Sequence, residues 1–436
     1  MEQKDQKGLS RRQFMRSAGM TAAGMVAGTL LGDRVIAATT GVAPAAGRVI
    51  GANDRINMGV IGVGGMGGGH LHALKGLEAD QNIKVVAVCD VFEKRRNAAK
   101  VTAQVDDASV YGDYRKLLER RDVDEVVIAT PDHWHGKIAV EAMQAGKHVY
   151  VEKPMTRYLD EAMEMWETAK STNRLVQVGS QGCSDSRWHQ AGQVVKDGKV
   201  GKLLWAQGSY CRNNPGGEWN YHIDPDANAG NLDWKMWLGS APKRDWDPER
   251  YFRWRKYWDY GTGIIGDLWP HRLYPLMIAM NLTDFPKRVA CIGSDITKSD
   301  KGYGAPRDVA DATMMMVEFP GGEMIYLAGS TVNEQGLQDI IRFNKGTMYI
   351  GDGFTVKPER PYVDELEEFS EPRKGPGESQ VEHHKNMFDS IRKNKQPNCG
   401  IELGVRVQTM VSMAETSYRK NKMMVFDQSR LRMRAG

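Results

Sequence analysis

The chain has 436 residues, of which 41% are hydrophobic and 26% are charged. This is the composition of a folded globular protein, and the length allows two or three domains. The formal net charge is +4, and residues 1–46, with six Lys/Arg and three Asp/Glu, carry +3 of it. Residues 47–436 therefore have a net charge of about +1. This charge indicates neither a basic domain that binds nucleic acid nor a polybasic patch that binds a membrane surface.

Residues 1–46 have the pattern of a targeting segment. A twin arginine at 11–12 is followed by a mildly apolar, Ala- and Gly-rich stretch at 18–32. That stretch is too short and too weakly hydrophobic for a good membrane span. We therefore expect a twin-arginine (Tat) signal and linker, recognition by the Tat export machinery, and a periplasmic or otherwise extracytoplasmic protein. An uncleaved N-terminal anchor is the alternative.

The five cysteines are widely spaced, with no CxxC pair and no Cys/His cluster at zinc-binding spacing. The sequence therefore predicts neither a disulfide framework nor a metal site. A disulfide-free exported protein is consistent with the Tat route, because that route carries proteins already folded in a reducing cytoplasm.

Strands and helices alternate from residue 56 to residue 172. The expected strands are short, nearly continuous apolar runs, as in strands buried on both faces. This alternation predicts parallel βαβ units, and so an N-terminal α/β Rossmann domain with a doubly wound parallel sheet at about 47–175. The expected strands are 56–61, 83–89, 125–129 and 148–151, and the expected helices are 69–77, 92–104, 135–145 and 159–172.

The pattern changes from residue 176 onward, where isolated strands are separated by turn residues such as those at 320–322. Such turns favour antiparallel hairpins. We expect a second α/β domain at about 176–405 with a mostly antiparallel open sheet. A C-terminal helix is expected to begin at about residue 401. The C-terminal part of the chain, residues 406–436, which comprises most of this helix and the tail after it, is expected to pack on the first domain. The expected strands are 203–210, 288–293, 312–319, 323–329 and 346–350.

A glycine-rich turn, GVGGMG at 62–67, follows the first strand and opens the first helix. In this position it matches the dinucleotide fingerprint, with glycines for the tight turn, for backbone approach to a pyrophosphate and for helix packing. The phosphates then meet the free N–H groups of the helix N-terminus. The alternative is a glycine-rich surface turn without a ligand. The expected cofactor-binding residues of the turn are Gly62, Gly64, Gly65, Met66 and Gly67.

Asp90 ends the second strand, 23 residues after Gly67. An acidic residue in this position binds the adenosine ribose hydroxyls and repels a 2′-phosphate, which predicts NAD as the cofactor. Three basic residues at 94–96 follow closely, so NADP stays open.

Three further motifs lie where such a fold presents groups to the nicotinamide ring. ATPDHWH at 129–135 and EKP at 152–154 each follow a strand, and open α/β sheets bind ligands at these carboxyl ends. In DLWPH at 267–271, an i,i+4 spacing would place Asp267 and His271 on one helical face.

In these motifs the chain resembles the glucose–fructose oxidoreductase/inositol dehydrogenase family, Gfo/Idh/MocA, and a segment at 381–388 looks like the start of a C-terminal helix of that family. The resemblance implies that Lys153, Asp267 and His271 are catalytic. It also implies a homo-oligomer with the open sheet at an interface. Tyr274 departs from the pattern, because an aspartate is common there. Further implied cofactor contacts are Thr130, Pro131, His135, Glu152 and Lys153.

The chemistry agrees with this assignment. Oxidation of a sugar alcohol needs a base for the hydroxyl proton while the hydride passes to nicotinamide. His271 suits this role, since an ordinary imidazole has a pKa of about 6.5, and Asp267 orients it or relays the proton. Lys153 donates to the substrate oxygen.

Each of these groups also has a plain structural interpretation. Asp267 is a possible helix N-cap, His271 a possible core histidine, and His133 and His135 possible helix-start residues without a catalytic part.

Eight of the eleven tryptophans lie between residues 205 and 269, many of them in a long loop at 213–259. Loops of that length are usually functional. Aromatic rings stack on the C–H faces of sugars, so the cluster suits a carbohydrate or polyol substrate, with core packing as the alternative. The expected substrate contacts are Trp254, Trp258, Trp269 and Tyr274.

Free NAD(P) is scarce outside the cytoplasm, so an exported enzyme has to keep its cofactor and restore it within the site. The sequence therefore predicts an NAD(P)-dependent oxidoreductase with tightly bound cofactor, which transfers a hydride to or from a sugar, glycoside or cyclitol hydroxyl carbon. Two alternatives stay open. One is an NAD-dependent glycosidase that acts by transient oxidation, elimination, hydration and reduction, and the other is a non-catalytic nucleotide-binding protein.

Overall fold

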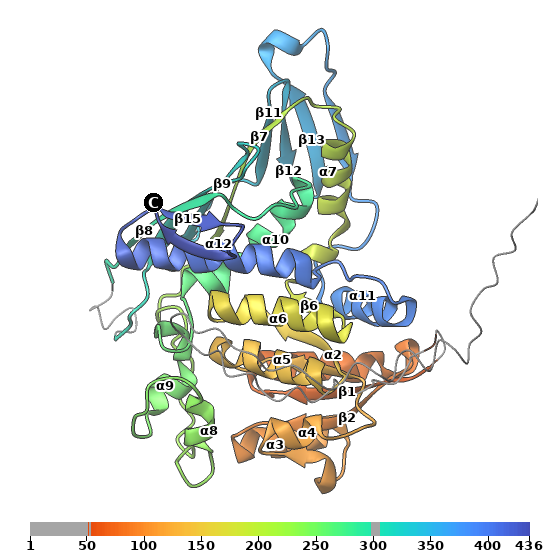
Figure 1. Cartoon of the computed structure of the whole chain (residues 1–436), viewed down its shortest axis with the longest axis vertical. Helices are drawn as coiled ribbons and strands as arrows, with labels where there is room; N and C mark the ends of the chain where they lie inside the picture. The colour runs from red at the N-terminus through yellow and green to blue at the C-terminus, as the bar shows by residue number, and fades with distance from the viewer. Residues whose placement is uncertain (1–50, 52–53, 298–305) are drawn as a thin grey trace, which may run out of the picture. The chain divides into compact units, whose positions relative to one another are not determined.

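The computed structural model describes residues 54–297 and 306–436, together with Gly51 (Figure 1). The signal and linker expected at 1–46 lie outside the described residues. The described residues fall into one compact unit. None of the helices described combines the length and the apolar character that crossing a membrane requires.

The first domain is built on a six-stranded parallel sheet in the order β3-β2-β1-β4-β5-β6. The strand order reverses between β1 and β4, which is the switch point where doubly wound sheets bind ligands. This topology confirms the expected Rossmann architecture. The strands are β1 (Ile56–Ile61), β2 (Ile83–Cys89), β3 (Val110–Tyr111), β4 (Glu125–Ile128), β5 (His148–Glu152) and β6 (Val176–Gly179).

Helices connect these strands, as the alternating pattern predicts. Every residue of β4 and β5 is buried, which explains why the apolar residues of these strands follow one another without alternation. The helices are α2 (Gly65–Gln81), α3 (Glu93–Ala103), α4 (Tyr114–Leu118), α5 (His135–Gln144) and α6 (Leu159–Thr172).

The first sheet extends further along the chain than the sequence pattern indicates. β6 pairs with β5 in parallel, so residues 176–179, which we expected in the second domain, form the sixth strand of the first sheet. The strand has only four residues, and its valines alone do not distinguish it from the isolated strands that follow.

The second domain contains a ten-stranded sheet in the order β14-β13-β12-β11-β7-β10-β9-β8-β15-β16. Among these strands only β10 and β7 pair in parallel, which confirms a mostly antiparallel sheet. The strands are β7 (Leu203–Cys211), β8 (Arg288–Ser294), β9 (Ala312–Glu318), β10 (Met324–Ser330), β11 (Ile340–Phe343), β12 (Gly346–Ile350), β13 (Gly353–Pro358), β14 (Phe369–Pro372), β15 (Met424–Asp427) and β16 (Arg432–Ala435).

One face of this sheet is buried and the other carries exposed apolar side chains. Burial alternates along β9, and the exposed positions of the sheet include Ile292, Met314, Met316 and Met324. The homo-oligomer expected at this sheet stays a prediction.

The C-terminal helix α12 (Ile401–Lys420) packs on both domains: it contacts α6 and β6 of the first domain and β8 of the second. The expected packing of the tail on the first domain is wrong. β15 and β16 instead extend the second sheet beside β8. Phe426 of β15 stacks on Phe285 with ring centroids 5.1 Å apart, and this buried contact holds the tail there.

A long segment at 213–262, which we call the cover segment, leaves the second sheet after β7. The sequence suggested a loop, and the structure shows short helices within it: α8 (Trp234–Leu238) and α9 (Pro248–Phe252). In Figure 1 these helices lie beside the first domain near α3. Two further helices follow it, the π-helical turn η5 (Ile264–Leu268) and α10 (Pro270–Ala279).

Candidate active site

The glycine-rich turn lies between the carboxyl end of β1 and the start of α2. Gly62 has φ +82°, in the left-handed region that favours glycine. A Cβ on Gly67 would lie 1.7 Å from the carbonyl oxygen of Gly62, so only glycine allows α2 to approach the turn. A Cβ on Gly65 would meet nothing within 4 Å, because this position faces the open cleft. The turn thus leaves backbone N–H groups of the helix N-terminus accessible to an anion.

Asp90 braces this turn from the end of β2. Its Oδ2 accepts a hydrogen bond from the backbone N–H of Val63 at 2.9 Å, and its Oδ1 accepts one from Phe92 at 2.8 Å. Asp90 also lines the adjoining cleft. Each oxygen has a second lone pair, so this bracing is compatible with the expected contact to a ribose hydroxyl.

A cleft of about 750 Å³ runs along the carboxyl ends of the strands. Ten of the eleven expected cofactor-binding residues line this cleft, and Gly67 alone is buried beneath the turn. The lining residues from the sequence prediction are Gly62, Gly64, Gly65, Met66, Asp90, Thr130, Pro131, His135, Glu152 and Lys153, together with Trp254.

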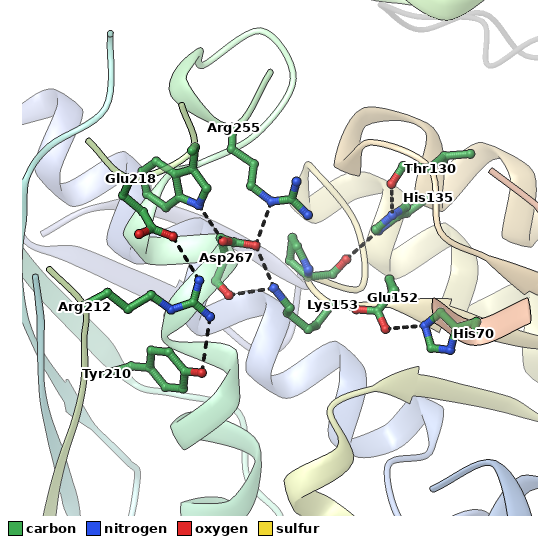
Figure 2. A network of polar contacts seen from close by, with 12 residues as sticks. His70, Thr130, His135, Glu152, Lys153, Tyr210, Arg212, Glu218, Arg255 and Asp267 are labelled. Atoms are coloured by element: carbon green, nitrogen blue, oxygen red, sulfur yellow. Dashed lines mark hydrogen bonds and ion pairs between the residues drawn. The ribbon is translucent and has the colours of Figure 1, made fainter. Parts of the chain in front are cut away.

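Lys153 is tied to Asp267 at one end of the cleft (Figure 2). Its Nζ donates to the Oδ1 of Asp267 at 2.7 Å and to the backbone oxygen of the same residue at 2.7 Å. The two residues are 114 positions apart in the chain. The structure therefore brings together two of the three groups expected to be catalytic.

Two residues that the sequence did not single out complete the surroundings of Asp267. Arg255 Nε donates to Oδ1 at 3.0 Å, and Trp219 Nε1 donates to Oδ2 at 2.8 Å. Burial by itself would raise the pKa of Asp267, but the charges of Lys153 and Arg255 hold it well below its usual range. Asp267 is therefore a fixed negative charge that keeps its two cationic neighbours in place. The simple N-cap role is not seen, since α10 begins after Trp269 without a side-chain cap.

His271 lies on α10, behind this pair. The π-helical turn places an extra residue in the turn that contains Asp267, so the expected i,i+4 alignment of Asp267 with His271 does not apply. The imidazole stacks on Tyr210 with centroids 4.8 Å apart, and its Nδ1 is buried without a partner among the described residues. Burial, followed by the charge of Lys153, lowers the pKa of His271 to about 3. The ring is therefore neutral at physiological pH, and a weaker base than the sequence argument assumed.

His135 joins two cleft loops. Its Nδ1 lies 2.8 Å from the backbone oxygen of Pro154, and its Nε2 lies 2.8 Å from that of Thr130. The Lys153–Pro154 peptide bond is cis. His135 thus fixes the loop that carries Lys153 relative to the loop after β4, and Figure 2 shows its ring beside Thr130.

Glu152 is held by a chain of buried imidazoles. Its Oε1 lies 2.8 Å from Nε2 of His70 (Figure 2). Nδ1 of His70 in turn lies 2.8 Å from Nε2 of His384. Burial by itself would raise the pKa of Glu152, but the hydrogen bond from His70 and the nearby positive charges lower it. A charged Glu152 therefore faces the cleft beside Lys153.

Arg157, four residues after Lys153, anchors the same loop to the rest of the molecule. Its guanidinium makes two hydrogen bonds to Glu415 of α12, at 2.7 and 2.8 Å, and another to the backbone oxygen of Trp258 at 2.7 Å. All of this lies in the interior, because the side chain of Arg157 is 1% exposed.

Asp132 is a cleft residue that the sequence argument overlooked, although it stands inside the 129–135 motif. It lines the cleft and is 3% exposed. Burial raises the pKa of Asp132 to about 7, against the opposing charge of Arg255. Unlike Asp267, this carboxyl can exchange its proton near neutral pH, which is the property that acid–base chemistry needs.

The expected aromatic substrate contacts separate into two groups. Trp254 lines the cleft, together with Tyr221 and His222, which we did not anticipate. Trp269 and Tyr274 are fully buried, and Trp258 packs on Tyr418 at 6.1 Å between centroids. Trp269 and Tyr274 therefore belong to the core, whereas Trp258 is partly buried and packs against the core.

These features define a class: a two-domain α/β protein with a dinucleotide cleft at the switch point of a Rossmann sheet and a buried Lys–Asp pair at one end. Two family models match the chain, the NAD-binding Rossmann-fold domain of an oxidoreductase family at residues 56–180 and its C-terminal alpha/beta domain at 216–435. The chain belongs to the Gfo/Idh/MocA oxidoreductase family, and its first domain is the NAD-binding Rossmann domain of that family.

Curated relatives carry glycosidase names. The chain is 33% identical over 213 residues to "Glycosyl hydrolase family 109 protein 2" of Shewanella sp. strain ANA-3, a match that covers 47% of this chain and 46% of that protein. It is 28% identical over 287 residues to "Glycosyl hydrolase family 109 protein" of Shewanella pealeana, covering 63% and 56%. The matches thus span about half the length of these relatives.

Solved structures share the fold at lower identity. Levoglucosan dehydrogenase, in complex with NADH and levoglucosan, superposes with a TM-score of 0.64 at 19% identity, covering 85% of this chain and 99% of that one. The aldose-aldose oxidoreductase of Caulobacter crescentus, complexed with glycerol, gives a TM-score of 0.63 at 15% identity, covering 85% and 100%.

Proposed function

We propose that the protein is an NAD-dependent oxidoreductase that acts on a hydroxyl-bearing carbon of a sugar, glycoside or cyclitol and keeps its cofactor bound. The observation that carries this proposal is the Lys153 ammonium, which lines the cleft and is anchored to Asp267. When bound, the nicotinamide takes up and returns a hydride. The protein then has to bind the substrate oxygen and manage one proton.

Lys153 is positioned to bind the substrate oxygen at the reacting carbon. Its ammonium has three donors and gives two of its hydrogen bonds to Asp267, so a third remains to be directed elsewhere. The ion pair with Asp267 holds the ammonium in place. A donor fixed in this way stabilises the negative charge that develops on the oxygen as its proton leaves.

Two groups are candidates for the base that receives the hydroxyl proton. His271 is neutral and has a free lone pair, but burial makes it a weak base with a pKa of about 3. Asp132 lines the cleft itself, with a pKa of about 7. We favour Asp132 for proton transfer at neutral pH, since a base works best when its pKa lies near the working pH.

The proposal is tested with the purified holoprotein. Sugars, glycosides and cyclitols are added one at a time, and absorbance near 340 nm reports reduction of the bound nicotinamide. We expect at least one of these compounds to reduce it in a single turnover without added NAD. A protein that binds NAD but is reduced by no compound of these classes would contradict the substrate class.

A glycosidase that regenerates its cofactor within each turnover is the second candidate. The names of the curated relatives favour it. It predicts a released aglycone with no net NADH, together with incorporation of solvent deuterium next to the oxidised carbon. Oxidised sugar formed in proportion to reduced cofactor favours the simple oxidoreductase instead. A Lys153→Met variant with full activity would favour the third, non-catalytic interpretation.

NAD is the proposed cofactor rather than NADP. Asp90 places a carboxylate at the ribose end of the cleft, where it would repel a 2′-phosphate. We expect NAD to bind at least about tenfold more tightly than NADP, and Asp90→Asn to narrow that ratio, with titration calorimetry as the measurement. Equal affinities for the two dinucleotides in the unmodified protein would contradict this choice.

We further propose export by the twin-arginine route. It rests on the arginines at 11–12 and the weakly apolar stretch after them. Replacing both arginines by lysine should leave the protein in the cytoplasmic fraction, whereas the unmodified chain should reach the periplasm. Export that survives the double replacement would refute the route.

A further inference from the structure

The cover segment is joined to the first domain directly after Asp90. Phe92 and Leu232 form an antiparallel bridge, flanked by a hydrogen bond from Glu93 N–H to the Asn231 oxygen at 3.0 Å and another from Asp233 N–H to the Val91 oxygen at 3.2 Å. The second domain therefore attaches to the first at the residues that follow the predicted ribose contact.

A second attachment lies across the cleft, after β4. The backbone oxygen of Trp237 accepts a hydrogen bond from Nε1 of Trp134 at 2.7 Å and lies 2.9 Å from Nε2 of His133. Residues 133–134 follow Thr130, while residues 91–93 follow Asp90. The cover segment thus spans from the end of β2 to the end of β4, and the adenosine half of a dinucleotide lies in a Rossmann cleft near the end of β2.

Between these two attachments the cover segment contributes the wall of the cleft. Met236, Trp237, Tyr251 and Phe252 line the same cavity as Gly64 and Gly65 of the phosphate-binding turn. The aromatic rings of this wall pack together, with Trp237 and Tyr251 centroids 5.4 Å apart. Phe92 of the first domain packs against Phe252 with centroids 6.5 Å apart. This wall is a packed aromatic cluster, so moving it exposes several large apolar side chains at once.

A cation of the first domain fastens the cluster from inside the cleft. Arg95 donates to the hydroxyl of Tyr251 at 3.0 Å, and its guanidinium lies 5.1 Å from the centroid of that ring. At the rim of the cleft, Lys94 pairs with Asp224 and Asp226 at 2.8 Å each. The Lys94 side chain is 55% exposed, and we assign little of the attachment to these ion pairs.

From this arrangement we infer that the cover segment is a clamp on the adenosine half of the cofactor: Met236, Trp237, Tyr251 and Phe252 bind it, and the dinucleotide enters or leaves only when the bridge between Phe92 and Leu232 opens. This inference rests on the proposed function, because it requires that NAD stays bound to the protein. The inference further identifies the residues that retain NAD, and these residues belong to the domain that is expected to bind the substrate.

The bridge offers a direct test, because the pattern of its flanking hydrogen bonds makes Phe92 and Leu232 a non-hydrogen-bonded antiparallel pair. Cα atoms of such pairs lie about 4.5 Å apart, within the range that a disulfide spans. A Phe92→Cys/Leu232→Cys variant is loaded with NADH under reducing conditions, oxidised, and diluted into excess NAD. Loss of NADH fluorescence then gives the release rate in the locked and unlocked states of the same protein.

We expect release from the oxidised protein to be at least about tenfold slower than from the reduced protein, and reduction to restore the faster rate. The Phe92→Cys single variant, taken through the same redox cycle, controls for oxidation of the native cysteines. Equal release rates in the locked and unlocked states would overturn the clamp. No sugar is present, so a wrong substrate class leaves this result unaffected, whereas a protein that binds no NADH would refute both proposals.

Hydrogen exchange on the unmodified protein gives a second measurement in case the double variant does not fold. NADH should slow exchange at the amides of Glu93 and Asp233, since both donate across the bridge, and leave exchange at a distant amide such as Asn344 unchanged. Identical protection of Glu93 and Asp233 with and without NADH would also overturn the proposal.

Discussion

The two ends of the cleft are built in different ways. The phosphate-binding turn is made of backbone from six consecutive residues, and its shape is set by where a Cβ does not fit. The opposite end is made of side chains from distant segments, with Lys153, Asp267 and Arg255 held by ion pairs. The phosphate-binding turn can be recognised in a short stretch of sequence, whereas the end that holds Lys153 forms only after both domains have come together. We therefore expect the turn to govern binding of the dinucleotide and the Lys153 end to govern the chemical step.

The strongest test of this division is Lys153→Met. Removing the ammonium should lower kcat by about 10³-fold or more, because a donor to the developing oxyanion is lost in a water-poor site. NADH affinity should change by less than about threefold. Single-turnover reduction and fluorescence titration measure the two quantities. Lys170→Met, an exposed lysine on α6, should change neither, and a Lys153 variant that mainly loses NADH affinity would break the comparison.

Gly67→Ala is the matching change at the other end. The new Cβ would lie 1.7 Å from the Gly62 oxygen, so the turn must move and NAD affinity should fall by about 100-fold or more, measured by titration calorimetry. Gly69→Ala is the matched control, since a Cβ there meets nothing within 4 Å and alanine favours the helix. If Gly67→Ala bound NAD normally and lost only turnover, the proposed division of roles would be wrong.

Asp132→Asn separates the roles of the two carboxylates at the Lys153 end of the cleft, Asp132 and Asp267. A base that works when ionised should make the rate rise through a pH of about 7, the pKa to which burial raises Asp132. The variant should be about 10- to 100-fold slower above pH 7 and should lack this step in its pH profile. The control variant Asp160→Asn, on the surface of α6, should retain the step near pH 7 in its pH profile. A step that persists unchanged in Asp132→Asn would assign the proton transfer to another group.

The smallest expected effect lies outside the cleft, at Glu125 of β4. Both carboxyl oxygens are buried without a partner among the described residues, and burial raises the pKa of Glu125 from 4.5 to about 8. The unfolded chain loses this proton at lower pH than the folded chain does, so the free energy of unfolding falls as pH rises across that interval. Glu125→Gln should therefore raise Tm by a few degrees at pH 8 and change it less at pH 5.

Thermal unfolding followed by circular dichroism at the two pH values makes this measurement. Glu119→Gln, an exposed neighbour, should leave the pH dependence of Tm unaltered. A Glu125 variant that is less stable than the unmodified protein at pH 8 would mean that the ionised carboxylate has a favourable partner.

The fold was predictable where the information is local. The parallel sheet, the glycine-rich turn and helices such as α6 follow from runs of a few residues. Short strands such as β3, with two residues, and β6 carry too little pattern of their own, and they become strands because the sheet beside them offers hydrogen bonds. The tail forms β15 and β16 for the same reason.

The candidate site was predictable to a similar degree. Lys153 and Asp267 stand in recognisable motifs, but nothing in the sequence reports that Arg255 and Trp219 share the same carboxylate, because these contacts are set by the path of the cover segment. The pKa of His271 was beyond sequence reasoning as well, since it depends on burial and on the charge of Lys153. Asp132, in contrast, was predictable from the sequence, because it stands inside the 129–135 motif beside the expected cofactor contacts Thr130 and Pro131.

The contact between Arg157 and Glu415 has a consequence for the order in which the protein matures. Arg157 belongs to the loop that presents Lys153, yet its carboxylate partner is 258 positions later in the chain. During synthesis, the loop that presents the reactive lysine is not locked to α12 until Glu415 emerges. A nascent chain would therefore gain a fixed reactive lysine only when its synthesis is nearly complete.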